Sequence, residues 1–134
     1  MVAGFVNNVA AIMLVDTGAS VSILNADFYR RLLRNGCKLD HLNEYVRLSH
    51  LKCADGTPMP IIATVAADLK LGGLTVPAVF LVVESLCNDV LLGLELLEEC
   101  GAVIDMKTKV MSLFDGLTSV PMTREGRPIV VRSG

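Results

Sequence analysis

Long apolar runs are absent from this sequence, although 52% of its 134 residues are hydrophobic. No uninterrupted apolar stretch approaches the roughly 18 residues that a membrane-spanning helix needs, and no basic segment precedes the first apolar stretch. We therefore expect a soluble chain without an export signal, which neither spans a membrane nor is secreted. The apolar fraction is typical of one folded domain, because a chain of this length is too short for two comfortable cores.

Concentrated basic charge is scarce as well. The formal net charge is −2, and the Lys and Arg residues are scattered apart from Arg30, Arg31 and Arg34. This distribution lacks the electrostatic footprint of a nucleic-acid-binding surface, so we expect no DNA or RNA partner. Internal repeats, low-complexity segments and interdomain linkers are also missing, which again favours a single domain.

Closely paired cysteines are missing too. The four cysteines, including Cys87 and Cys100, have no short paired spacing, which favours reduced thiols in a reducing compartment. A zinc site is the alternative, because Cys37, His41, His50 and Cys53 are all ligand types. Their spacing matches no familiar zinc finger, and surface His with half-buried Cys is the commoner outcome. We therefore expect no metal and no organic cofactor.

The N-terminal part of the sequence predicts short strands and one helix. Asn7-Asn8 tolerates the positive φ angles of a tight turn, and Asn25 is a good helix-capping residue. Asn35-Gly36 supplies the helix stop. The expected elements are strands at Val2–Val6, Val9–Val15 and Ser20–Leu24 and a helix at Ala26–Arg34.

The remainder of the sequence predicts hairpins around a second short helix. Asp55-Gly56 and Gly72-Gly73 supply turns, and Gly101 supplies a helix stop. The expected strands are Leu42–Cys53, Pro60–Leu71, Leu74–Val83, Val90–Leu92, Val103–Met106, Val110–Phe114 and a candidate at Ile129–Arg132, with the helix beginning at Leu94. At eight or more short strands and two short helices, the fold class is all-β.

One carboxylate stands out from this pattern. Asp16 lies in "LVDTGASVSIL", directly after an apolar strand and before a small-residue turn. A buried aspartate costs several kcal/mol unless something holds it, so Asp16 is either a satisfied structural acid or a working one. In the structural alternative, the Asp-Thr-Gly turn is a hairpin corner whose carboxylate accepts backbone amides.

A second motif decides between these interpretations. "MLVDTGASVSIL" together with "NDVLLGLELLEECGAVIDM" resembles the retropepsin family of aspartic proteases, especially the proteases of long-terminal-repeat retroelements and their domesticated relatives. The resemblance covers about residues 5 to 114. It implies a retropepsin-like acid-protease barrel with one or two short helices, formed by residues 1–114, and a C-terminal tail at residues 115–134.

The implied activity is that of an aspartic endopeptidase. Amide hydrolysis in this class needs two carboxylates that share one proton around a water molecule. The chain contains a single Asp-Thr-Gly, so the second carboxylate must be the Asp16 of another copy, and we expect a twofold homodimer. Its substrate would be an extended polypeptide, with its own polyprotein precursor as one candidate. The implied location is the cytoplasm or a retroelement or viral particle.

The resemblance also assigns roles to the neighbours of Asp16. Thr17 resembles the threonine that hydrogen-bonds across the dimer, and Gly18 lets a backbone amide approach the carboxylate. Ala19 and Ser20 would be small wall residues beside substrate, where the Ser20 hydroxyl could tune the hydrogen bonding of the acid. Leu92-Gly93 matches the apolar-Gly position at which a strand crosses behind the active loop and a helix begins.

The hairpin centred on Ala54-Asp55-Gly56-Thr57 would be the flap that closes over the peptide and excludes water. A solvated turn without a role is the alternative. The sequence has less glycine here than better-known viral flaps, and Pro58 and Pro60 should stiffen one arm.

Two departures from the family pattern bear on dimerisation and activity. Only Met1 to Phe5 precede the first turn, so an N-terminal interface strand is missing from the pattern, and Arg127 to Arg132 is the candidate to replace it. A frayed tail is the alternative. The rival to the enzyme is a catalytically idle dimerisation or peptide-binding module of the same fold.

Overall fold

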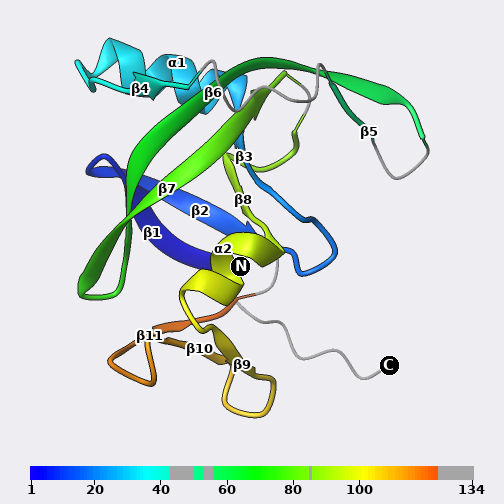
Figure 1. The fold of residues 1–134 in the computed structure, drawn as a ribbon. Helices are drawn as coiled ribbons and strands as arrows, with labels where there is room; N and C mark the ends of the chain where they lie inside the picture. The colour runs from blue at the N-terminus through cyan, green and yellow to red at the C-terminus, as the bar shows by residue number, and fades with distance from the viewer. Residues whose placement is uncertain (43–49, 53–55, 85, 124–134) are drawn as a thin grey trace.

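The computed structural model describes residues 1–42, 50–52, 56–84 and 86–123, and these form a mostly β fold (Figure 1). Its main sheet closes on itself, because β6 pairs both with β7 and with β1. Around the barrel the strands follow the order β1 (Val2–Val6), β2 (Val9–Val15), β8 (Val90–Leu92), β3 (Ser22–Asn25), β7 (Leu74–Val83) and β6 (Pro58–Leu71). The predicted all-β class is confirmed.

Asparagine residues fix the local structure of the N-terminal part. Asn7 and Asn8 have φ angles of 45° and 66°, which makes the tight turn between β1 and β2. Asn25 caps helix α1 (Ala26–Arg34), since its side chain accepts a hydrogen bond of 2.7 Å from the Asp27 amide. The hairpin, the helix and its cap are therefore confirmed, while β3 begins two residues later than predicted.

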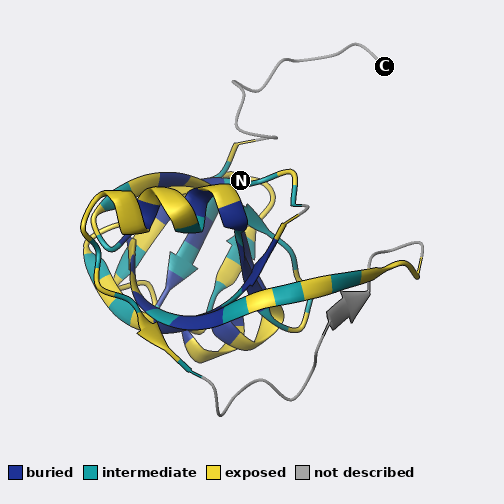
Figure 2. Cartoon of the chain, turned by 90° about the horizontal axis from the view of Figure 1, so that it is seen from above, coloured by how far each residue is buried: buried dark blue, intermediate teal, exposed yellow. Residues whose placement is uncertain are grey.

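A long hairpin of β6 and β7 forms the largest element pair. Its turn contains Gly72 with a φ angle of +58°, as a tight turn requires. The short strands β4 (Asp40–His41) and β5 (His50–Lys52) both pair with β6. Figure 1 shows β5 and the start of β6 projecting from the barrel, and in Figure 2 this part of β6 is largely exposed.

The C-terminal part adds a second, smaller sheet. Helix α2 (Leu94–Glu99) ends before Gly101, whose φ angle is +58°. The strands β9 (Val103–Asp105), β10 (Val110–Leu113) and β11 (Thr118–Pro121) then pair in the order β11-β10-β9. Strand β11 was not predicted, because its four residues contain a proline and lack a clear apolar alternation. The predicted strand at Ile129–Arg132 lies outside the described residues.

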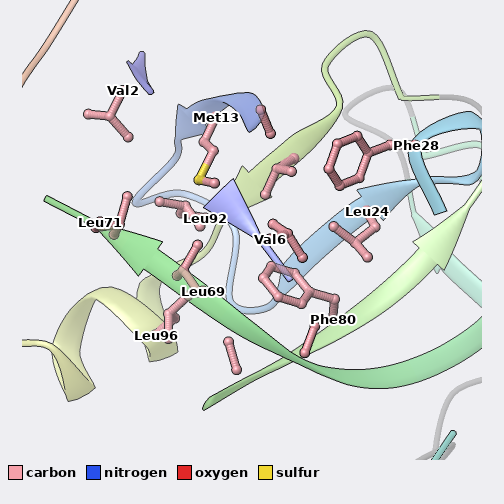
Figure 3. Packing of buried hydrophobic residues seen from close by; sticks show 14 of the residues in the cluster. Val2, Val6, Met13, Leu24, Phe28, Leu69, Leu71, Phe80, Leu92 and Leu96 are labelled. Carbon is pink, nitrogen blue, oxygen red and sulfur yellow. The ribbon is translucent and has the colours of Figure 1, made fainter. Parts of the chain in front are cut away.

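The main core fills the barrel. Figure 3 shows Val2, Val6, Met13, Leu24, Phe28, Leu69, Leu71, Phe80, Leu92 and Leu96 converging on its interior, and all of them are buried. Burying one such side chain contributes about 1.5–3 kcal/mol, so this core carries most of the apolar stabilisation. Neither helix in the described ranges is long and apolar enough to cross a membrane.

Candidate active site

Asp16 follows directly on β2 at the point where that strand meets β8. Val15 is in register with Leu92 of β8, and the Asp16 amide donates a 3.0 Å hydrogen bond to the Leu92 carbonyl. Strand β8 lies between β2 and β3, parallel to the first and antiparallel to the second. The loop that carries Asp16 therefore leaves β2, passes over β8 and returns to the sheet as β3.

The Asp16 side chain is half-buried, and its carboxylate accepts few hydrogen bonds. Its Oδ1 accepts a 2.9 Å hydrogen bond from the Gly18 amide, while the Asp16 carbonyl accepts one from the Ala19 amide at 3.2 Å. A Cβ atom added to Gly18 would lie 3.2 Å from Oδ1, so glycine permits this close approach. An ionised carboxylate has about four acceptor positions, and in the described chain only this one is filled. The group is held in place with most of its acceptor capacity unused.

Helix α2 begins against the same loop. The amides of Leu94 and Glu95 donate to the carbonyls of Ala19 and Ser20, at 2.7 and 3.1 Å. These are amides of the first helical turn, which have no partner within the helix. The loop that follows Asp16 is thereby anchored to the start of α2.

Gly93 is fixed between the loop and the helix. Its amide donates a 2.9 Å hydrogen bond to Oγ of the buried Ser22, and a Cβ at this position would clash with the backbone of Val21. The role of Ser22 was missed by the sequence analysis, which considered the Ser20 hydroxyl instead. Ser20 is exposed and offers its carbonyl to α2. The available signal was a small polar residue between the apolar Val21 and Ile23, at the start of β3.

A second apolar cluster borders the Asp16 loop. We call it the cleft cluster and define it by the buried residues Ile23, Val83 and Leu91 with the half-buried residues packed on them, Leu14, Ala19, Val21, Met59, Ile61 and Leu86. Leu14 and Ala19 flank Asp16 in the sequence. Apolar surface therefore lies beside the carboxylate, on the opposite side of β8 from the barrel core.

The predicted flap falls partly outside the described residues, since Ala54 and Asp55 are not described. Gly56 has a φ angle of +86° and is exposed, as is Thr57. The two predicted arms pair antiparallel, with His50 opposite Pro60 and Lys52 opposite Pro58. Met59 and Ile61 of one arm pack on the cleft cluster, so the hairpin borders the same apolar surface as Asp16.

The side chains considered for zinc have other contacts. The Cys37 thiol donates to the Asn7 carbonyl at 3.7 Å, and His41 Nε2 lies 2.7 Å from the Tyr29 hydroxyl. Cys53 and the side chain of His50 lie outside the described residues. In the rest of the chain, no group of three or more His, Cys, Asp or Glu side chains is placed to hold a metal.

The three described cysteines, Cys37, Cys87 and Cys100, are free thiols. Burial, and secondarily the charge of Glu99, raises the pKa of the Cys100 thiol. Cys100 therefore favours its neutral form, which is a poor nucleophile.

Comparison with known proteins agrees with this geometry. The family described as "gag-polyprotein putative aspartyl protease" matches residues 2–99. The UBA domain-containing protein Mud1 of Schizosaccharomyces pombe is 32% identical over 99 residues, which are 74% of this chain and 28% of that protein. The chain thus spans well under half of that relative's length.

Two solved structures share the fold. The retroviral protease-like domain of Ddi1 from Leishmania major superposes with a TM-score of 0.70 and 26% identity, over 93% of this chain and 94% of that one. The EIAV protease in complex with the inhibitor HBY-793 superposes with a TM-score of 0.60 and 20% identity, over 78% of this chain and 89% of that one. The predicted retropepsin-like barrel is confirmed.

Proposed function

The chain belongs to the gag-polyprotein putative aspartyl protease family, and from that premise we propose that it is an aspartic endopeptidase whose active site forms between two copies. The observation that carries the proposal is the Asp16 carboxylate, held by the Gly18 amide at 2.9 Å and bordered by the cleft cluster. A carboxylate placed to serve only as a hairpin corner would have its acceptor positions filled by backbone amides. Here most of that capacity is left for water, substrate or a second acid.

Two Asp16 side chains would divide the chemistry. The ionised carboxylate takes a proton from a water molecule as the water oxygen attacks the scissile carbonyl carbon, and the protonated carboxyl donates its proton to the carbonyl oxygen. The tetrahedral intermediate then collapses: the newly protonated carboxyl gives its proton to the leaving nitrogen, the C–N bond breaks, and a hydroxyl proton of the intermediate returns to the other carboxylate, which restores the singly protonated dyad. No metal or organic cofactor enters these steps. Thr17, exposed on the single chain, would bond across the twofold axis.

The cleft cluster supports an extended polypeptide with apolar side chains as the substrate. The half-buried members Leu14 and Val21 present apolar surface, buried Leu91 and Ile23 pack against them, and Ala19 is small enough to leave room beside the acid. The β5–β6 hairpin, with Gly56 and Thr57 near its tip, would cover the peptide and exclude water. A precursor that contains this chain is one such substrate. The free thiols support action in a reducing compartment, either the cytoplasm or a retroelement particle.

Cleavage of a mixed peptide library between pH 3 and 7 tests the activity. We expect the unmodified chain to cleave peptides and Asp16→Asn to lose about 10³-fold or more in kcat/KM, because the ionisable group is removed while the shape is kept. Asp115→Asn is the matched control, since Asp115 is also followed by glycine but is exposed on a turn away from the loop. A statine-type transition-state analogue should inhibit the unmodified chain.

The opposite result has a defined meaning. If neither protein cleaves any peptide although both sediment as folded dimers, the enzyme proposal is wrong and a dimerisation or peptide-binding module of the same fold replaces it.

Leu94 offers a test of the proposed dimer. It is 39% exposed, yet its amide bonds to the carbonyl of Ala19, so an exposed apolar side chain lies beside the loop that must face the partner. We expect Leu94→Lys to weaken dimerisation and cleavage together in sedimentation and kinetic assays. Leu117→Lys, at an even more exposed leucine in the β10–β11 turn, should change neither. Equal dimer stability in both variants would exclude an interface at Leu94.

A test of the C-terminal tail must remove fewer residues than the tail of residues 115–134 that the sequence indicates. Removing residues 116–134 would delete β11, whose Val120 is buried in the main core. Ending the chain after Thr123 keeps that strand and removes the proposed interface strand at residues 127–132. Thr123 donates to the Met1 carbonyl at 2.7 Å, so this tail would leave beside the N-terminus. We expect the shorter chain to dimerise less tightly in sedimentation; an unchanged dimer would exclude the tail from the interface.

A further inference from the structure

A cavity of about 550 Å³ lies on the outer face of the barrel, between the β6–β7 hairpin and α2. Val65 and Phe80, which are paired, point into the barrel core, so their neighbours Thr64 and Leu81, also paired, point the opposite way. The lining comprises three residues of α2, Glu95, Leu96 and Glu99, with Val21, Ser22, Thr64, Ala66, Pro77, Ala78, Val79 and Leu81. This volume lies within the usual range of ligand pockets, about 300–1,000 Å³.

Thr64 is the unexplained polar group of this pocket. It is only 3% exposed, and its hydroxyl oxygen is buried without a hydrogen-bond partner in the part of the chain that the structure describes. A buried hydroxyl without a partner costs about 1–3 kcal/mol, so natural proteins rarely keep one without a reason. A ligand that brings a hydrogen-bonding group into the pocket would remove that cost.

Two unpaired acids stand at the edge of the same pocket. Glu95 and Glu99 are one helical turn apart on α2, both are exposed, and neither has an ion-pair partner among the described residues. Like charges at this spacing repel one another. Glu84, by contrast, pairs with Arg30 at 2.7 Å. The pocket therefore combines apolar walls, a buried hydroxyl and uncompensated negative charge.

We propose that this pocket binds an arginine side chain of a polypeptide. Its alkyl stem would pack on Val79 and Leu81, while the guanidinium group, with five donors in a fixed fork, would reach the carboxylates of α2. Thr64 would turn about χ1 on binding to bring its buried hydroxyl oxygen within reach of the same group. A lysine has the charge but not the fork, and an apolar residue leaves both acids unpaired.

The position of the pocket identifies the source of the arginine. Val21 lines the pocket and also packs on the cleft cluster, so the two sites share a wall. The arginine therefore belongs to the polypeptide substrate, at a position away from the scissile bond. This choice of source rests on the proposed function, whereas the binding itself does not.

Peptide titrations followed by nuclear magnetic resonance test the binding without catalysis. The probe is the blocked tetrapeptide Ala-Val-Arg-Ala, compared with versions that carry citrulline or lysine instead of arginine, on the full chain with Asp16→Asn. We expect the arginine peptide to shift the amide signals of Thr64, Leu96 and Glu99. Citrulline keeps the shape and loses the charge, so the citrulline peptide should bind about 5-fold more weakly than the arginine peptide. Equal chemical-shift changes with the arginine and citrulline peptides, or no changes at the pocket residues with the arginine peptide, would overturn the inference.

Variants of the acids separate the pocket from general electrostatics. Glu95→Gln with Glu99→Gln should weaken binding of the arginine peptide about 5-fold, from the loss of two partly exposed ion pairs. Glu98→Gln is the matched control, because Glu98 lies on the same short helix, is exposed and does not line the pocket. If Glu98→Gln weakens binding as much as the double variant, the specific site does not exist.

Thr64 gives a readout that a structural role would not produce. Thr64→Val removes the unpaired hydroxyl at nearly constant shape, so we expect an equal or higher melting temperature together with about 2- to 10-fold weaker binding. Thr64→Ser restores the hydroxyl and should restore the affinity. Loss of stability with unchanged affinity in Thr64→Val would show that the hydroxyl serves the fold and not the ligand.

A cleavage assay then tests whether the bound arginine belongs to the polypeptide substrate. Substrates with arginine placed outside the cleaved region should have a higher kcat/KM than their citrulline versions, and the glutamine double variant should abolish the difference. Binding without any cleavage would contradict the proposed protease activity and support the arginine pocket. Cleavage with no preference for arginine, together with no amide chemical-shift changes at the pocket, would contradict the arginine pocket and support the protease.

Discussion

Leu91 and Leu92 are neighbours in β8, yet they belong to two different apolar regions. Leu92 is fully buried in the barrel core with some twenty other buried side chains, whereas Leu91 lies in the cleft cluster, whose other buried side chains are Ile23 and Val83. The alternation of a strand sends one leucine to each side. The comparison shows how one short strand can support both the fold and a surface beside Asp16, with the two uses separated by a single residue.

Gly93→Ala should have the largest effect, because it damages both regions at once. The added Cβ would clash with the backbone of Val21, which borders the cleft cluster, and backbone cannot move aside as a flexible side chain can. We expect a loss of more than about 4 kcal/mol in the free energy of unfolding, or no folded protein. Urea denaturation measures it. A variant of near-normal stability would show that the β8–α2 junction is softer than its geometry indicates.

The two leucines give the direct test of the comparison. Leu92→Ala should cost about 3–5 kcal/mol of unfolding free energy, because it opens a cavity in the densely packed barrel core. Leu91→Ala should cost less, about 2 kcal/mol, because the smaller cluster can relax or admit water. In peptide cleavage, only Leu91→Ala should change which side chains are accepted. Equal stability losses with no change in peptide preference would mean that the two regions do not differ in use.

Ser22→Ala should have a smaller effect, confined to the junction. It leaves the buried amide of Gly93 without its 2.9 Å acceptor, which costs about 1–2 kcal/mol. Ser22→Thr keeps the hydroxyl and is the control. Chemical denaturation and hydrogen exchange of the Gly93 amide measure the effect, and unaltered exchange in Ser22→Ala would exclude the bond from the support of the Asp16 loop.

The smallest effect is expected at an exposed side chain in neither cluster, Asp105 at the β9–β10 turn. The Asp105 carboxylate accepts hydrogen bonds from the amides of Thr108 and Lys107, at 3.2 and 2.9 Å, and these bonds lower its pKa below the ordinary 3.8. A lowered pKa means that the group stabilises the folded state above about pH 3.8 and that this contribution fades as the pH falls through the folded value.

Asp105→Asn tests this pH dependence. The amide oxygen of asparagine still accepts the same bonds but does not titrate, so thermal unfolding of the variant should lose less stability than the unmodified chain below pH 3.8. If the melting temperatures of the two proteins fall in parallel with pH, the Asp105 carboxylate has the same hydrogen bonding in the folded and the unfolded chain.

Much of the local structure was predictable because local signals specify it. The turn at Asn7-Asn8 and the cap at Asn25 follow from residues that tolerate positive φ angles or accept backbone amides. Strand β11 escaped prediction because its four residues lack a clear apolar alternation, and its strongest support is long-range: Val120 is buried in the main core. The function of Ser22 escaped for the same reason, since its partner Gly93 is 71 residues away.

The sequence by itself determined the all-β class and the family resemblance, and it is the ground on which Asp16 is proposed as the acid, because turn chemistry, strand alternation and the Asp-Thr-Gly motif are all properties of neighbouring residues. Only the tertiary structure decided which apolar residues became core and which came to border Asp16. It also placed Thr64, Glu95 and Glu99 around one cavity. Those relations join residues far apart in the chain, and closure of the barrel brings them together.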